Sequence, residues 1–334
     1  MDDVRWFSSN RYGALPVPAL GRAGLRVALE GDRAARLAFA LDGQSAVAGF
    51  AFARRHRCAL VLKIPDVPPW RLEGGHPDFV VAAGAKVVRV PRLWGRYPER
   101  PGYYSRIRYI ARHADAVWCP STNSVQGVFR YYGVSAELMP FCYDSDRFSS
   151  VGPRPPTVHS APFTIVSISR LVPHKNHAVI LRAAARLEPR PRVRILGQGP
   201  EADTLRRIAA ELGVELDLPG TWASDDQILD AYRHAGVVVA PSRFEGFGLT
   251  PLEGLAMGVP VIASDIPSHR EFLGSAVRFF PPEDDIALAG ELGRIVSRPS
   301  SRPAVQPSVL EPLTIEACAA RLLPALRRFV DGGP

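Results

Sequence analysis

Two glutamates, Glu245 and Glu253, flank a glycine-aromatic-glycine turn within residues 241–256 (PSRFEGFGLTPLEGLA). The apolar run before the turn predicts a buried strand, and the alanine- and leucine-rich residues after it predict a helix. Ligands of open α/β sheets bind where strands end and helices begin, so the two carboxylates could hold opposite ends of one bound molecule. Gly246 and Gly248 carry no side chains, which lets backbone N–H groups at the helix start approach an anion. Either glutamate alone is equally compatible with a solvated acid, but the whole segment favours a ligand site.

Lysine is rare in this chain, because 38 of its 41 basic residues are arginine. Lys175 follows a predicted strand at residues 163–169 and shares its loop with Arg170. A compact ammonium and a forked guanidinium at the end of one strand suit a diphosphate. A surface loop without a ligand is the alternative, and the pair taken by itself favours that alternative.

Composition indicates an ordinary globular protein. Of the 334 residues, 46% are hydrophobic and 22% are charged, and the length predicts about two domains. The start of the chain shows no basic segment followed by an apolar core, and no apolar run is long enough to span a bilayer. The four cysteines have no C-x-x-C or Cys/His spacing, which argues against a zinc site and a disulfide framework. These features favour a cytoplasmic location.

The excess of positive over negative charge lies in the first half of the chain. Residues 1–150 hold 21 basic and 13 acidic residues, a net charge of +8, and the remainder has no net charge. No nucleic-acid-binding motif accompanies this charge, so nucleic acid is not an expected partner. A solvated arginine-rich surface is the favoured interpretation. An anionic acceptor or peripheral contact with an acidic lipid surface is the alternative.

Strands alternate with helices along both halves, which predicts an α/β fold with parallel sheets. A proline-rich stretch at residues 151–160 predicts a linker. We therefore expect two Rossmann-like domains facing a central cleft. The first covers residues 1–150 and the second residues 161–314, and a last helix within 315–334 packs back toward the first domain.

The segment with the two glutamates resembles the E-x7-E donor site of retaining GT-B glycosyltransferases of family 4. This family includes sucrose synthases and many bacterial mannosyl- and glucosyltransferases. The resemblance extends from about residue 114 to residue 330. It is carried by these segments in chain order: ADAVWCPST (114–122), DSDRF (144–148), SRLVPHKN (169–176), LGQGPE (196–201), GTW (220–222) and the stretch through both glutamates.

The resemblance implies a role for each matching residue. The implied contacts are, for the donor diphosphate, Arg170, Lys175, Gly248, Leu249 and Thr250; for the donor sugar, Glu245, Gly246 and Phe247; for the ribose, Glu253; and for the base, Trp222 and Gly197. It implies a structural turn, and no metal site, for the D-x-D formed by Asp144 and Asp146. No cofactor or metal is expected, because the nucleotide sugar is itself a substrate.

The first hundred residues depart from the family pattern. The first loop has only Asn10–Gly13 in place of a glycine-rich loop, which leaves Gly13 as its candidate contact. Asp66 stands after the strand at residues 59–64, where the family carries a histidine near the reacting sugar. Asp66 is thus a catalytic candidate beside Glu245, although a polar turn residue is the favoured interpretation of Asp66.

The resemblance thus implies a retaining, metal-independent hexosyltransferase that uses a UDP- or GDP-sugar and a hydroxyl acceptor. A small-molecule acceptor is favoured. A donor-binding pseudoenzyme and a GT-B epimerase or phosphorylase are the alternatives. A nicotinamide oxidoreductase is remote, since the predicted strand at residues 4–8 is not followed by G-x-G-x-x-G. The sequence does not define the base, the sugar, the acceptor or the oligomeric state.

Overall fold

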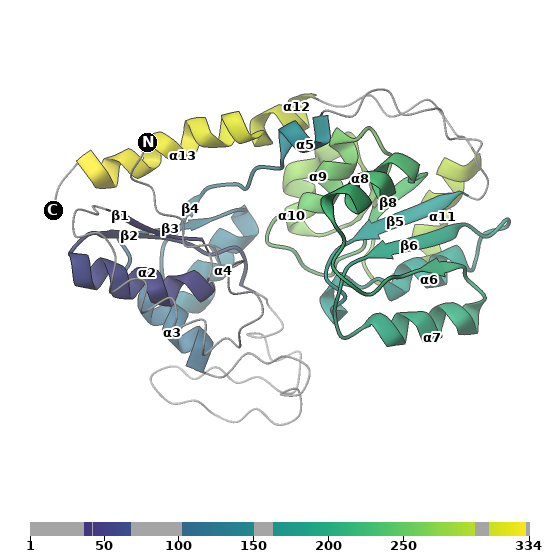
Figure 1. Ribbon diagram of the computed structural model, residues 1–334, viewed down its shortest axis with the longest axis horizontal. Coiled ribbons are helices and arrows are strands. Elements are labelled where there is room, and N and C mark those ends of the chain that lie inside the picture. The colour runs from purple at the N-terminus through teal and green to yellow at the C-terminus, as the bar shows by residue number, and fades with distance from the viewer. Residues whose placement is uncertain (1–36, 42, 68–101, 150–162, 298–306, 332–334) are drawn as a thin grey trace. The chain divides into compact units, whose positions relative to one another are not determined.

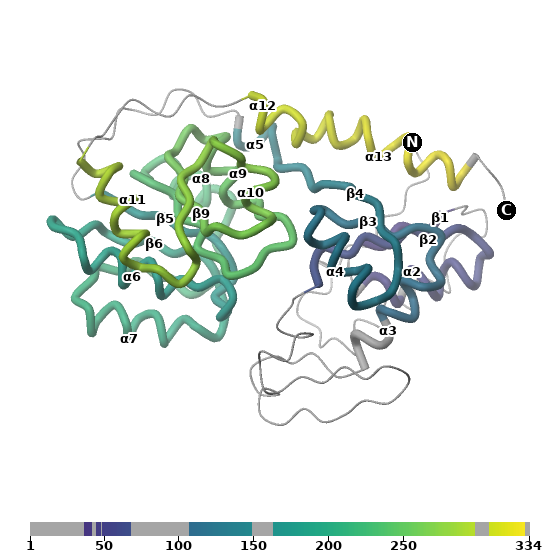
Figure 2. Tube along the Cα trace, turned by 180° about the vertical axis from the view of Figure 1, so that it is seen from behind, coloured from purple at the N-terminus to yellow at the C-terminus, as the bar shows by residue number. Residues whose placement is uncertain are grey.

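A computed structural model describes residues 37–41, 43–67, 102–149, 163–297 and 307–331. The chain divides into two compact units, one of residues 1–140 and 320–334, and one of residues 141–319. Each unit is a parallel sheet covered by helices (Figure 1), and Figure 2 shows the same elements from behind. The α/β class, the parallel sheets and the two domains are thus as the sequence predicts. The predicted strands at residues 4–8, 25–29 and 86–90 lie outside the described residues.

The described residues of the first unit form a four-stranded sheet in the order β1-β2-β3-β4. Its described elements are β1 (Leu37–Ala40), α2 (Gly43–His56), β2 (Ala59–Lys63), α3 (Gly102–Ala111), β3 (Ala116–Cys119), α4 (Thr122–Tyr132) and β4 (Glu137–Leu138). One face of the sheet packs against α2, α3 and α4. The other face, with Trp118 fully buried, packs against Leu322 and Phe329 of α13 (Ile315–Asp331).

Local signals set the bounds of α4. The hydroxyl of Ser121 accepts from the backbone N–H of Ser124 at 3.1 Å and caps the first turn. Gly133 ends the helix in the left-handed region at φ 64°, and its N–H bonds the carbonyl of Phe129. The predicted helix at residues 123–132 is therefore present with nearly the same ends.

The second unit has a six-stranded parallel sheet in the order β10-β9-β8-β5-β6-β7. Its strands are β5 (Thr164–Ile168), β6 (Arg192–Leu196), β7 (Leu216–Asp217), β8 (Val237–Ala240), β9 (Val261–Ser264) and β10 (Arg278–Phe280). Its helices are α5 (Ser145–Ser149), α6 (Ala178–Ala184), α7 (Ala202–Leu212), α8 (Asp225–His234), α9 (Leu249–Ala256), α10 (Pro267–Leu273), α11 (Asp285–Ser297) and α12 (Pro307–Leu310), with 3-10 turns at Pro173–Lys175, Gly274–Ala276 and Glu311–Leu313.

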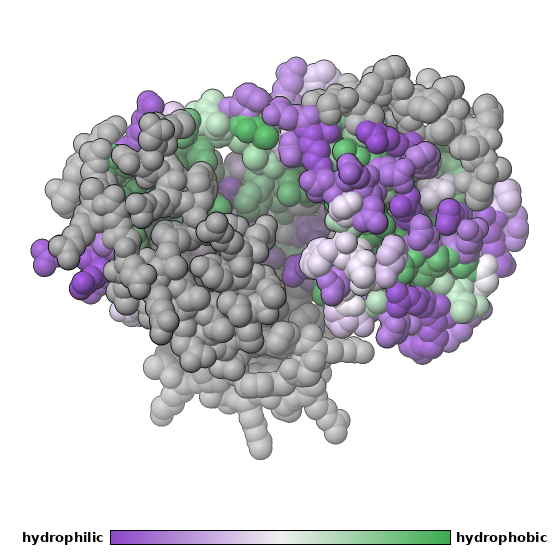
Figure 3. Space-filling view, viewed as in Figure 1, coloured by the Kyte–Doolittle hydropathy of each residue, from purple (hydrophilic) through white to green (hydrophobic). Residues whose placement is uncertain are grey.

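Successive residues of these strands point to opposite faces of the sheet and pack into two separate hydrophobic cores. Ile165 and Val239 point to the face covered by α6, α7 and α11. Val166 and Val238 point to the opposite face, which α5, α8 and α9 cover. Continuous apolar strands such as VVVA in β8 are what a sheet covered on both faces requires. Polar side chains cover much of the outer face of this unit in the view of Figure 3.

The unit boundary differs from the predicted domain boundary at residue 150. Residues 141–149 cluster with the second unit, because Tyr143 and Phe148 are buried in its core. The boundary also falls inside α13, whose residues from Ala320 onward cluster with the first unit. The predicted linker at residues 151–160 lies outside the described residues. Within the described ranges, no helix combines the length and apolarity needed to cross a membrane.

Candidate functional site

The candidate site lies at the point where the strand order of the second sheet reverses. From β5 the chain proceeds outward to β6 and β7, and it then returns to place β8 on the other side of β5. Loops after β5 and β8 therefore diverge to opposite faces of the sheet. In open α/β sheets, the carboxyl ends of the strands at such a point are the usual ligand site.

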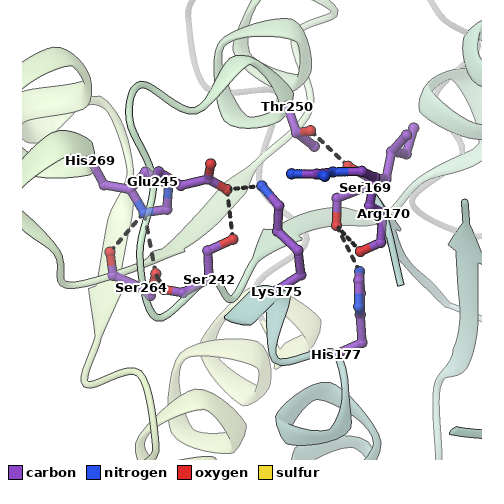
Figure 4. A network of polar contacts seen from close by, with 10 residues as sticks. Ser169, Arg170, Lys175, His177, Ser242, Glu245, Thr250, Ser264 and His269 are labelled. Carbon is purple, nitrogen blue, oxygen red and sulfur yellow. Dashed lines mark hydrogen bonds and ion pairs between the residues drawn. The ribbon is translucent and has the colours of Figure 1, made fainter. Parts of the chain in front are cut away.

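Lys175 and Glu245 form an ion pair at this switch point (Figure 4). The Nζ of Lys175 donates to Oε1 of Glu245, and the hydroxyl of Ser242 donates to the same oxygen at 2.7 Å. The two charged side chains are only 13% and 16% exposed. Burial by itself would raise the pKa of Glu245, but the charge of Lys175 and the two hydrogen bonds outweigh it and lower the pKa to about 2. Glu245 is therefore a carboxylate at any physiological pH.

The loop that carries Lys175 is fixed by contacts on both of its sides. Asn176, in the left-handed region at φ 54°, donates from Nδ2 to the carbonyl of Pro282 at 2.6 Å. The backbone N–H of Arg243 bonds the carbonyl of His174 at 2.8 Å, and its guanidinium pairs with Glu283. The ammonium is thus held in place before any ligand arrives.

His177 supports the same loop through a contact with the end of β5. Its Nε2 lies 2.9 Å from the hydroxyl of Ser169, the residue after β5. Burial, together with the nearby charge of Lys175, lowers the pKa of His177 to about 3, so the imidazole is neutral. Arg170, the next residue, is exposed and extends toward the Lys175–Glu245 pair (Figure 4).

The glycine turn leads directly into α9. Gly248 caps the helix at φ 100°, and a Cβ on it would lie 3.1 Å from the ring of His269. The first backbone N–H groups of α9, at Leu249 and Thr250, have no partner within the helix, an arrangement that suits an anion. The hydroxyl of Thr250 donates to the carbonyl of Ile168 at 2.7 Å, so it anchors the turn to β5.

The contact implied for Phe247 can come only from its backbone, because its side chain is buried. Its side chain is 5% exposed and packs against Phe141 and Phe272, with ring centroids 5.9 Å and 4.3 Å away. The aromatic ring therefore belongs to the apolar core, and only the backbone of Phe247 remains for a ligand. Burying this ring holds the turn against the sheet.

Glu253 lies one turn into α9. Its Oε2 accepts a hydrogen bond of 2.7 Å from the hydroxyl of Tyr232. Burial raises the pKa of Glu253, while the bond from Tyr232 and the charge of Arg147 act in the opposite direction.

The two residues implied for the base are placed very differently. Trp222 follows β7 and is 67% exposed, so its ring is open to stacking. Gly197 ends β6 at φ 154°, and a Cβ on it would lie 1.9 Å from the carbonyl oxygen of Ser169. Packing of neighbouring loops thus accounts for the glycine at 197 without a ligand.

Two candidates are residues of the first unit. Asp66 belongs to the first unit, half-buried after β2. Gly13 lies outside the described residues. The D-x-D of Asp144 and Asp146 starts α5, and Asp144 Oδ1 accepts from the backbone N–H of Arg147 at 3.0 Å. No group of metal-binding side chains is found over the described ranges.

Sequence reasoning missed four residues that support the site: Ser242, His177, His269 and Tyr232. Ser242 lies three residues before Glu245, a spacing at which a side chain can turn back onto a carboxylate, and it could have been found. His177 lies only two residues after Lys175, whereas His269 and Tyr232 lie on other elements and only the fold brings them to Glu245 and Glu253.

Residues 154–307 match the family described as Glycosyl transferases group 1. The GDP-mannose-dependent alpha-(1-6)-phosphatidylinositol monomannoside mannosyltransferase of Mycolicibacterium smegmatis is 32% identical over 183 residues, which cover 47% of this chain and 46% of that protein. The D-inositol 3-phosphate glycosyltransferase of the same species is 40% identical over 111 residues, or 30% of this chain and 25% of that protein. The chain thus spans about half the length, or less, of these curated relatives.

Solved structures resemble the whole chain. Sucrose-phosphate synthase from Thermosynechococcus elongatus superposes with a TM-score of 0.74 at 19% identity, covering 96% of this chain and 81% of that one. HepE from Anabaena, in complex with UDP and glucose, gives 0.73 at 16% identity, covering 97% and 84%. These likenesses confirm the two-domain GT-B fold. On this fold, the match to the glycosyl transferases group 1 family covers residues 154–307.

Proposed function

We propose that this protein is a retaining glycosyltransferase that transfers a sugar from a nucleoside-diphosphate sugar to a hydroxyl of a small-molecule acceptor. The observation that carries the proposal is the Lys175–Glu245 pair beside the start of α9. A fixed cation and helix-start N–H groups suit a diphosphate, and a fixed carboxylate beside them suits sugar hydroxyls. The group 1 match over residues 154–307 supports a glycosyltransferase.

Catalysis follows from where charge develops. As the bond between the sugar C1 and the diphosphate oxygen breaks, its electron pair passes to the departing diphosphate. Lys175, Arg170 and the N–H groups of α9 stabilise that charge most when it is fully formed. The acceptor hydroxyl attacks C1 from the face that the diphosphate leaves, and its proton passes to a phosphate oxygen. Glu245 orients the sugar hydroxyls. We propose no metal ion, because these groups can balance the departing charge.

The donor base is uridine or guanosine in this proposal. One relative is named as GDP-mannose-dependent, and one structural neighbour was solved with UDP and glucose. Glu253 would take the ribose hydroxyls, and Trp222 would stack on the base.

A test combines transfer and stereochemistry. The purified chain is incubated with a panel of UDP- and GDP-sugars and small hydroxyl acceptors, and the product anomer is determined by NMR. The proposal expects the anomer of the donor to be retained, and an inverted product would contradict it. Binding of the donor with neither sugar transfer nor donor hydrolysis would favour the pseudoenzyme. The presence of Asp66 where the family carries a histidine points to that alternative. Turnover without an acceptor would favour an epimerase.

A further inference from the structure

Tyr232 is a fully buried tyrosine whose hydroxyl points at the candidate donor site. It lies on α8 and is 0% exposed. The hydroxyl donates to Oε2 of Glu253 at 2.7 Å, and it lies 3.4 Å from the carbonyl oxygen of Thr250. A buried phenol needs a hydrogen-bond acceptor, and here both acceptors belong to α9. The Tyr232 hydroxyl thus links α8 to α9, the helix that starts at the glycine turn.

Aromatic and charged groups of α5 hold Tyr232 from the other side. The ring of Phe148 meets the Tyr232 ring edge-on, with centroids 5.8 Å apart. The guanidinium of Arg147 lies 5.0 Å from the centre of the Phe148 ring and pairs with Asp225 at 3.0 Å. Asp225 opens α8 itself. The tyrosine therefore has little freedom to move away from Glu253.

We propose that Tyr232 is a positioning residue for the nucleotide: it fixes one oxygen of Glu253 and leaves the other to accept from a pentose hydroxyl. The inference rests on the proposed function, in which Glu253 holds the ribose. A carboxylate accepts through both oxygens, so occupying Oε2 orients the plane in which Oε1 can receive a ligand. Without the hydroxyl, that plane would rotate freely about the end of the side chain.

Tyr232 also opposes protonation of Glu253. Burial raises the pKa of Glu253, and Asp144 acts in the same direction, whereas the Tyr232 bond and the charge of Arg147 lower it. Removing the phenolic hydroxyl therefore raises the pKa of Glu253 further. A protonated Glu253 is a poorer acceptor for the ribose, so nucleotide binding would be lost at a higher pH as the solution is acidified.

The test uses isothermal calorimetry with UDP and GDP. Whichever binds the wild-type protein more tightly is compared with its 2′-deoxy and 3′-deoxy forms. We expect Tyr232→Phe to weaken binding of the ribose nucleotide about tenfold, the usual effect of one hydrogen bond to a charged group. Binding of the deoxy form that the wild type disfavours should change much less. The acid limb of ribose nucleotide binding, which is the pH range over which acidification abolishes binding, should move to higher pH.

Two further variants separate positioning from general damage. In a Glu253→Gln background, Tyr232→Phe should have little additional effect, because the tyrosine acts through that carboxylate. Tyr143→Phe removes another buried tyrosine hydroxyl from the same core and should bind as the wild type does. If Tyr232→Phe does not fold, 3-fluorotyrosine incorporated in place of Tyr232 tests the same point. Its stronger hydroxyl donor should move the acid limb to lower pH.

The possible failures are distinguishable. Tyr232→Phe could still prefer the ribose nucleotide over its deoxy form as the wild type does, and could lose binding at the same acidic pH. That result would overturn the role of Tyr232 and leave the donor site intact. Equal binding of ribose and deoxyribose nucleotides by the wild type would overturn both the assignment of Glu253 and the inference. Failure of the folded wild type to bind either nucleotide would overturn the proposed function and the inference with it.

Discussion

Lys175 and Glu245 are 70 residues apart in the chain, yet the ammonium of one donates directly to the carboxylate of the other. The first follows β5 and the second follows β8, and these strands are neighbours only because the sheet reverses its order there. The cation that we propose for the phosphates and the anion that we propose for the sugar are thus fixed against each other. The charge of Lys175 keeps Glu245 ionised in a site that is largely shielded from water.

Replacing Lys175 should weaken nucleoside diphosphate binding at least about tenfold. Lys175→Ala removes a fixed cation and leaves Glu245 buried without its strongest neutralising partner, so the effect exceeds that of losing one surface charge. Calorimetric titration measures it. Arg207→Ala, an exposed arginine on α7, is the matched loss of one positive charge and should bind normally. Equal affinities for both variants and the wild type would remove Lys175 from the site.

His177 should make the protein less stable as the pH falls from 7.5 to 5. Its pKa is about 3 when folded and 6.5 as the ordinary value, so below pH 6.5 only the unfolded chain takes up the proton. At pH 5 this difference lowers the free energy of unfolding by about 2 kcal/mol. Urea unfolding followed by circular dichroism should therefore show a pH dependence about 2 kcal/mol smaller for His177→Gln. The same pH dependence in both proteins would mean that His177 is not held neutral.

Gly248→Ala should destabilise the protein by about 1–3 kcal/mol, because alanine is strained at φ 100° and its Cβ would press on the His269 ring. Donor binding should fall with it, since the turn carries the N–H groups of the helix start. Gly290→Ala is the control, since a Cβ there meets nothing within 4 Å inside α11. That helical substitution should be neutral or stabilising by about 0.5–1 kcal/mol in thermal or urea unfolding. Similar behaviour of the two variants would argue against a constrained turn.

Trp222→Ala should weaken nucleotide binding about tenfold without changing the melting temperature. Stacking of a base on an aromatic ring is worth about 1–3 kcal/mol, and a side chain that is 67% exposed contributes little to folding. Phe129→Ala, an aromatic that is 65% exposed on α4, should change neither property. Unaltered affinity in Trp222→Ala would place the base elsewhere.

The order of strands and helices in the second unit could be predicted because apolar periodicity records it directly. VVVA of β8 and the capping serine of α8 are examples. The pairing of Lys175 with Glu245 could not, since it depends on which strands are neighbours. Nor does the sequence state that the Phe247 ring faces Phe141 and Phe272 instead of a ligand.

Some elements escaped prediction for local reasons. The helix α3 is rich in tyrosine and arginine and has no clear apolar stripe, so its periodicity is weak. The placement of residues 141–149 with the second unit depends on the burial of Tyr143 and Phe148. Composition near the proline-rich stretch marks a linker but not the unit to which the preceding residues attach.

The central claim is that the second unit binds the diphosphate and pentose of an activated sugar. Calorimetric titration of the folded protein with UDP, GDP, ADP and TDP tests it most directly. The account predicts saturable binding of UDP or GDP, weakened by Lys175→Ala and by Glu253→Ala. No binding of any of the four nucleotides, by protein whose circular dichroism shows it folded, would contradict it.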